Sequence, residues 1–139
     1  MSRLAGSLDA NVLLRLLLND VPDQHAAALS LLETSPAQFA VADTAVIEVA
    51  FVLERHYQFS RRQIREAIDG LLSLTELNCN RALFKSALSI FAKHASLSFE
   101  DCCLASYAVL NQAEPLWTFD RELAAKVSSV KRVPAALRL

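Results

Sequence analysis

Short apolar runs along the chain alternate with longer stretches in which apolar residues recur at helical spacing. The runs predict strands at 4–8, 38–42, 75–77, 116–119 and 130–133. The stretches between them predict helices at 11–18, from the 20–23 turn to about 32, and at 44–57, 60–72, 81–95, 98–111 and 120–127. Short strands that alternate with helices indicate a parallel sheet covered on both faces, which is an α/β sandwich.

One helix start carries both a capping signal and a cluster of cations. Ser60 and Gln63 have the spacing of a capping box, in which each side chain bonds a free backbone amide of the other residue. Arg61, Arg62 and Arg65 follow in the same turn and the next, where positive charge opposes the helix dipole. Helix stability therefore does not explain them. A solvated face is favoured over an RNA contact, and both alternatives stay open.

Composition places the chain among globular proteins with one domain over residues 1–139. It has 139 residues, of which 53% are hydrophobic and 21% charged, so it is long enough to bury a core without disulfides. No apolar run approaches the length of a bilayer span, and polar residues interrupt the N-terminal segment where a signal peptide needs an apolar stretch. We expect a cytoplasmic protein with no membrane segment.

Several kinds of site are excluded or disfavoured by residue counts. The net charge is -1, so contact with nucleic acid requires a local basic patch. Two glycines are too few for a phosphate-binding glycine-rich loop. The three cysteines and three histidines lack metal-ligand spacing, so we expect reduced, partly buried thiols and assign the histidines no chemistry. Trp117, within a predicted strand, is expected in the core.

Four carboxylates stand in apolar surroundings: Asp9, Glu48, Asp101 and Asp120. Asp9 and Asp120 follow predicted strands, at the sheet edge where ligands bind in open α/β folds. Glu48 and Asp101 are expected near the first turns of helices that start at that edge, so the four side chains can converge. Carboxylates without imidazole or thiolate among them suit Mg²⁺ or Mn²⁺.

Helix capping is the simpler interpretation of three of these acids. Asp9 and Asp120 are placed to cap the helices that follow them. Asp101 completes a capping-box pattern with Ser98. Glu48, in the middle of an apolar segment, does not fit that interpretation.

Segments 7–13, 44–49, 98–101 and 118–121 resemble the ordered motifs of PIN-domain ribonucleases, in particular VapC-type toxins. The resemblance implies a three-layer α/β/α sandwich with a central parallel sheet of four to five strands, and an acidic pocket for Mg²⁺ or Mn²⁺. It assigns metal binding and catalysis to Asp9, Glu48, Asp101 and Asp120, and gives a supporting role to Asn11, Thr44 and Thr118. Glu100 and the Cys102–Cys103 pair depart from the family pattern, although the apolar stripe that follows Asp101 favours it over Glu100 as the inward acid.

The implied activity is hydrolysis of an RNA phosphodiester by a metal-bound water, in an endoribonuclease silenced by a cognate VapB-like antitoxin. The resemblance also implies a homodimer. Arg15 and Arg121 lie near the acidic motifs in sequence and are candidates for phosphate contacts. A non-catalytic PIN-like scaffold that binds RNA or protein is the alternative. A phosphotransfer receiver domain is disfavoured, because the paired acid and the late lysine that it needs do not fit this sequence.

Overall fold

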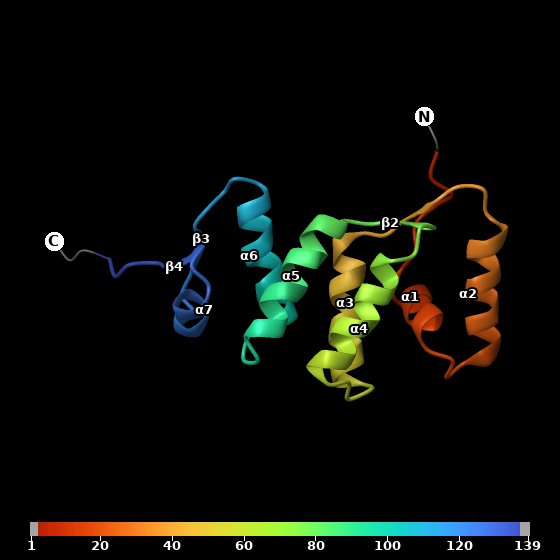
Figure 1. Cartoon of the computed structure of the whole chain (residues 1–139), viewed down its shortest axis with the longest axis horizontal. Coiled ribbons are helices and arrows are strands. Elements are labelled where there is room, and N and C mark those ends of the chain that lie inside the picture. The colour runs from red at the N-terminus through yellow and green to blue at the C-terminus, as the bar shows by residue number, and fades with distance from the viewer. Residues whose placement is uncertain (1–2, 137–139) are drawn as a thin grey trace. The chain divides into compact units, whose positions relative to one another are not determined.

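A computed structural model describes residues 3–136, which divide into two compact units at Arg81–Ala82. The elements of the N-terminal unit are α1 (Ala10–Leu17), α2 (Pro22–Thr34), β1 (Phe39–Ala40), α3 (Asp43–Arg55), α4 (Arg61–Leu72) and β2 (Leu77–Asn78) (Figure 1). The elements of the C-terminal unit are α5 (Arg81–Lys93), which begins at the boundary, α6 (Phe99–Leu110), β3 (Leu116–Thr118), α7 (Arg121–Lys126) and β4 (Val130–Arg132).

The sheet of the N-terminal unit is short and parallel. Phe39 pairs with Leu77, and Ala40 pairs with Asn78. The segment before α1 runs parallel to β1 on its other side, through a single bridge between Ser7 and Ala40. The strand predicted at 4–8 is thus reduced to one bridge with neighbouring hydrogen bonds, among them one of 3.0 Å from the Leu8 N–H to the Ala40 carbonyl.

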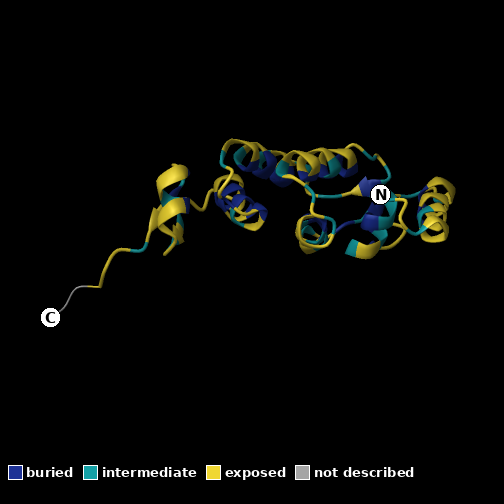
Figure 2. Ribbon diagram, turned by 90° about the horizontal axis from the view of Figure 1, so that it is seen from below, coloured by how far each residue is buried: buried dark blue, intermediate teal, exposed yellow. Residues whose placement is uncertain are grey.

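Helix packing forms the core of the N-terminal unit. Helix α1 packs against α2, α3 and α4, and its residues Leu13 and Leu14 are buried. Figure 2 shows these buried stripes on helices that are exposed on their other sides. The capping box predicted at the start of α4 is confirmed: the Gln63 N–H donates to Ser60 Oγ at 3.1 Å, and the Ser60 N–H donates to Gln63 Oε1 at 2.8 Å.

The C-terminal unit combines an aromatic cluster with a second parallel pair of strands. The Phe99 ring lies 6.1 Å from the Phe84 ring and 5.5 Å from the Phe91 ring, so α6 is joined to α5 by aromatic contacts. Strands β3 and β4 pair in parallel from Leu116 opposite Val130 to Thr118 opposite Arg132. Helix α7 packs on both strands.

Three expectations can be compared with this architecture. The α/β class and the parallel pairing are confirmed, but the structure over residues 3–136 has one two-stranded sheet in each unit and no central sheet of four to five strands. The prediction that Trp117 lies in the core is wrong, because its side chain is 56% exposed. Successive strand residues face opposite sides, so Trp117 points away from half-buried Leu116 and Thr118. The single domain over 1–139 stays a prediction.

Between residues 3 and 136, no helix combines the length and the apolar character that crossing a bilayer requires.

Candidate active site

Asp9 is the N-cap of α1. Its backbone is extended (φ -85°, ψ 174°), and its Oδ1 accepts the Val12 N–H at 3.0 Å. This is the capping interaction that the sequence suggested. The side chain is exposed, and the cap uses one carboxylate oxygen, so Oδ2 lies outside this bond.

Glu48 lies on the exposed side of α3, in its second turn rather than its first. Its sequence neighbours Val46, Val49 and Ala50 are buried, yet the helical repeat turns Glu48 away from them. The prediction that Glu48 has apolar surroundings is therefore wrong. The apolar residues next to it in sequence lie on the buried face of α3, and Glu48 lies on the exposed face. Because α1 packs on α3, Asp9 and Glu48 belong to neighbouring helices of one unit.

Asp101 occupies the first turn of α6. Its N–H donates to Ser98 Oγ at 3.1 Å, which is one half of the capping box. Over residues 3–136, no hydrogen bond joins the Asp101 carboxylate to Ser98, so the cap uses the backbone of Asp101 and leaves its carboxylate outside the cap. Asp101 is half-buried whereas Glu100 is exposed, in agreement with the expectation that Asp101 is the inward acid.

Asp120 is the N-cap of α7 and is exposed. Its Oδ1 accepts the N–H groups of Glu122 at 2.9 Å and Leu123 at 3.0 Å. The Asp120 N–H donates to Thr118 Oγ1 at 3.0 Å, so Thr118 fixes the turn that presents this carboxylate. A second oxygen, Oδ2, again lies outside the capping bonds.

The four carboxylates are divided between the two units. Asp9 and Glu48 belong to the N-terminal unit, and Asp101 and Asp120 belong to the C-terminal unit. From residue 3 to residue 136, no three His, Cys, Asp or Glu side chains are grouped as a metal site. The chemistry of the donors nevertheless fits a hard divalent cation, because each is an exposed or half-buried carboxylate with at least one oxygen outside the capping bonds.

A groove of about 370 Å³ lies beside Asp9 in the N-terminal unit. Its polar lining comes from Asp9, Asn11 and Arg15 of the α1 region and from Gln24 of α2. Its apolar lining consists of Val12, Ala27, Ala28 and Leu31. Asn11 thus lines the same groove as Asp9, while Thr44 lies exposed in the first turn of α3. The supporting roles of both residues stay predictions.

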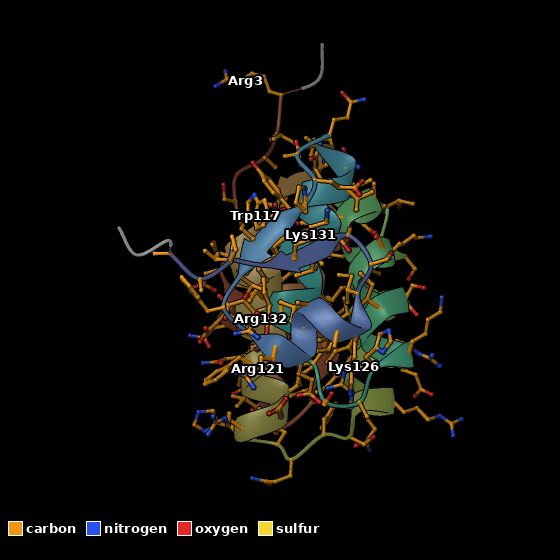
Figure 3. All side chains as sticks on the ribbon, turned by 90° about the vertical axis from the view of Figure 1, so that its left-hand side faces the viewer. Arg3, Trp117, Arg121, Lys126, Lys131 and Arg132 are labelled. Atoms are coloured by element: carbon orange, nitrogen blue, oxygen red, sulfur yellow. The ribbon has the colours of Figure 1, made fainter. Side chains whose placement is uncertain are left out.

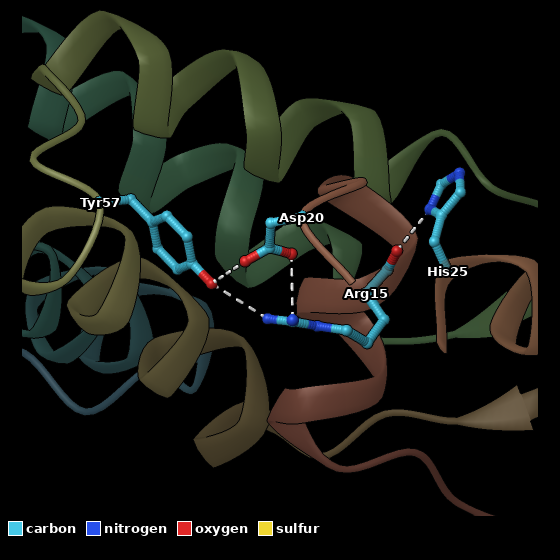
Figure 4. Close-up of polar contacts among 4 residues, drawn as sticks. All are labelled: Arg15, Asp20, His25 and Tyr57. Atoms are coloured by element: carbon cyan, nitrogen blue, oxygen red, sulfur yellow. Dashed lines mark hydrogen bonds and ion pairs between the residues drawn. The ribbon is translucent and has the colours of Figure 1, made fainter. Parts of the chain in front are cut away.

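Arg15 already has partners on the protein (Figure 4). Its Nη1 lies 3.0 Å from Asp20 Oδ1, and its Nη2 donates to the Tyr57 hydroxyl at 3.1 Å. The Tyr57 hydroxyl donates to Asp20 Oδ2 at 2.6 Å. This bond, followed by the charge of Arg15, holds the pKa of Asp20 below its ordinary value. A phosphate contact by Arg15 must compete with this network.

Sequence patterns alone did not predict this network. The sequence feature that could have revealed it is Arg15, which interrupts the apolar run Leu13–Leu18. A guanidinium on an apolar helix needs a hydrogen-bond acceptor nearby. The Arg15 side chain is 14% exposed, and its carbonyl lies 2.6 Å from His25 Nδ1. Arg121, in contrast, is exposed at the start of α7 (Figure 3), and no ion pair involves it in the described part of the chain.

A comparison with protein families matches the PIN domain over residues 7–128. The matched span contains all four motif segments and crosses both units. No curated protein matches the chain significantly. PIN domains are generally nucleases and typically use divalent metals. Because the match covers well over half of its length, the chain belongs to the PIN-domain family.

Proposed function

We propose that this PIN domain is a metal-dependent endoribonuclease that hydrolyses RNA phosphodiester bonds, and that it is the toxin of a toxin–antitoxin pair. The observation that carries the proposal is that Asp9, Glu48, Asp101 and Asp120 all lie within the span matched by the family. Each has an exposed or half-buried carboxylate. The three-layer α/β/α sandwich with a central parallel sheet of four to five strands, which the family resemblance implies, is part of the proposal. Within residues 3–136 the structure itself has two separate two-stranded sheets.

A bound Mg²⁺ or Mn²⁺ would supply a water of lowered pKa and screen the charge that develops on the phosphate. The four carboxylates would hold that ion, directly or through water. Asp9 and Asp120 each give one oxygen to a helix N-terminus, which fixes the side chain and leaves the second oxygen outside the capping bonds. A carboxylate fixed in this way loses little conformational entropy when it binds a ligand.

The neutral polar residues support the carboxylates in this proposal. Thr118 accepts the Asp120 N–H and so holds the turn before α7. Asn11 lines the groove beside Asp9. Thr44 is the third supporting residue, and exposed Arg121, adjacent to Asp120, is a better candidate for a phosphate contact than Arg15.

The proposal extends to partners and location. A VapB-like antitoxin would lay an apolar helix against α3 and α4 and send a basic side chain towards the acids. A homodimer would cover apolar side chains such as Leu104, Tyr107 and Leu110 of α6, which are 46%, 56% and 48% exposed. A cytoplasmic location fits a partner and a substrate of this kind.

A circular RNA substrate tests the endonuclease directly, because an exonuclease has no end from which to start. The purified chain should convert circular RNA to linear fragments in Mg²⁺ or Mn²⁺ and leave it intact in EDTA. Asp9→Asn should abolish the conversion. If RNA binds but stays intact with either metal, the non-catalytic scaffold is the correct function, and the nuclease proposal fails.

A further inference from the structure

The turn between α3 and α4 carries a concentration of arginines that the proposed active site does not use. We call the set formed by Arg55, Arg61, Arg62 and Arg65 the arginine cluster; it lies at one end of the α3–α4 hairpin (Figure 1). Residues 51–66 contain these four arginines and only two acids, Glu54 and Glu66, whereas the whole chain has a net charge of -1. This end of the hairpin is therefore a local basic surface on a slightly acidic protein.

The turn that joins the two helices is well defined. The Phe59 N–H donates to the Leu53 carbonyl at 3.0 Å, and Gln58 takes the left-handed conformation (φ 49°) that lets the chain reverse. The Tyr57 hydroxyl is bonded to both Arg15 and Asp20. These contacts fix the backbone on which the arginines stand.

Two of the arginines can readily reach a ligand. Arg62 pairs with Glu66 at 3.2 Å, but the two side chains are 82% and 62% exposed, so the pair is weak and easily exchanged. Arg65 is exposed, and no ion pair involves it within residues 3–136. Both therefore present guanidinium groups to solvent at the start of α4.

An exposed aromatic ring lies beside one member of the arginine cluster, Arg55. Phe51 on α3 is 52% exposed, and the Arg55 guanidinium lies 5.3 Å from its ring centre. A phenylalanine at a helix surface has an unfavourable contact with water, which a stacked base would remove. The ring and the guanidinium plane together form a stacking surface.

Helix stability does not account for the cluster. Arg61 and Arg62 are the first two residues of α4, where the helix dipole is positive and cations are unfavourable. The capping box already bonds the amides of Ser60 and Gln63, so the arginines are not needed to complete the cap. A bound polyanion would offset the repulsion.

We propose that this end of the α3–α4 hairpin binds single-stranded RNA, with Arg62 and Arg65 on successive phosphates and an unpaired base on the Phe51–Arg55 surface. The choice of RNA rests on the proposed function. Phosphates match the forked guanidinium groups, and an unpaired base matches the exposed ring, whereas an acidic peptide would use the charges alone. The surface would begin one helical turn after the motif carboxylate Glu48, because Phe51 follows it by three residues on α3 and is exposed like it.

The test measures binding without cleavage. A fluorescein-labelled, mixed-sequence 12-nucleotide RNA is titrated with the full chain in EDTA, by anisotropy, at several salt concentrations. Arg62→Gln with Arg65→Gln should lower the slope of log affinity against log salt by about 1.4, which corresponds to about 25-fold weaker binding at 0.1 M salt. Phe51→Leu should weaken binding about fivefold or more with no change of slope.

The matched control removes two exposed lysines of α5, as Lys85→Gln with Lys93→Gln, which changes the net charge equally and should leave the slope unchanged. Circular dichroism should show that all variants keep their helix content. The proposal is overturned if the arginine and lysine variants weaken binding equally, or if polyglutamate displaces the RNA as well as unlabelled RNA does. RNA binding that fails in the arginine variant while the parent cleaves no RNA would support this surface and contradict only the proposed nuclease.

Discussion

The Arg15 guanidinium and the Asp20 carboxylate form an ion pair of 3.0 Å, which joins α1 to the turn before α2. Tyr57, which follows α3, bonds both partners through its hydroxyl. Three segments of the N-terminal unit are thus tied together beside the groove that contains Asp9. Two predictions follow from the chemistry of this network.

Tyr57→Phe removes the hydroxyl and keeps the ring. Because the hydroxyl both accepts from Arg15 and donates to Asp20, we expect the free energy of unfolding to fall by about 1 kcal/mol. Urea denaturation measures the change. Tyr107→Phe on α6 is the matched control, since that ring is 56% exposed, and it should leave stability unaltered.

The acid dependence of stability should contain a contribution from Asp20. Its pKa is lowered, first by the hydrogen bond from Tyr57 and then by the charge of Arg15. A carboxyl with a lowered folded pKa stabilises the fold fully above its ordinary value of about 3.9 and loses that contribution as the pH falls through the folded pKa. Carboxyl NMR titration should show a higher Asp20 pKa in Tyr57→Phe than in the parent. An identical pKa in both proteins would rule out the hydroxyl as the main cause.

Asp120 should have separable capping and functional roles. Asp120→Ala loses the cap of α7 and should cost about 1 kcal/mol, whereas Asp120→Asn keeps the capping oxygen and should unfold like the parent. Trp117, the chain's single tryptophan, lies three residues earlier and reports the transition by fluorescence. Equal destabilisation by Ala and Asn would mean that the charge, and not the cap, holds α7.

The thiols should react in an order set by their burial. Burial raises the pKa of Cys79, an effect that the nearby charge of Arg81 partly opposes. A thiol with a raised pKa has little thiolate at neutral pH, so we expect Cys79 to be alkylated slowly by iodoacetamide, and faster above pH 9. Cys102 and Cys103 are fully covered and should react only on unfolding. Mass spectrometry of the alkylated peptides distinguishes the three sites.

Local signals in the sequence predicted the elements well. The capping box fixed the start of α4, and helical spacing placed α5 and α6 to within about two residues at their ends. Such features depend on contacts within a few residues, so they can be predicted from short windows. The strands predicted at 38–42, 116–119 and 130–133 are at the right places but too long, the one at 75–77 overlaps β2 at Leu77 alone, and 4–8 forms a single bridge. Strand pairing, which sequence spacing does not reveal, sets these bounds.

Side-chain environment was harder to predict. Glu48 sits among apolar residues in sequence but on the exposed side of α3, and Trp117 lies in a strand but faces solvent. In both cases apolar neighbours in sequence suggest a buried site, but the periodicity of a helix or strand places neighbouring residues on different faces. Arg15 was missed for a different reason: its partner Tyr57 is 42 residues away in sequence, so no short window contains both residues. The joint action of the four acids stays a prediction.

The initial rate of RNA cleavage in Mg²⁺ or Mn²⁺ tests the central claim most directly, measured for the parent and for Asp9→Asn, Glu48→Gln, Asp101→Asn and Asp120→Asn. The controls are Asp23→Asn and Glu33→Gln, two exposed acids of α2 outside the motifs. We predict losses of about 100-fold or more in each motif variant, control rates within about twofold of the parent, and no cleavage in EDTA. Cleavage that persists in EDTA, or that survives in all four motif variants, would contradict the account.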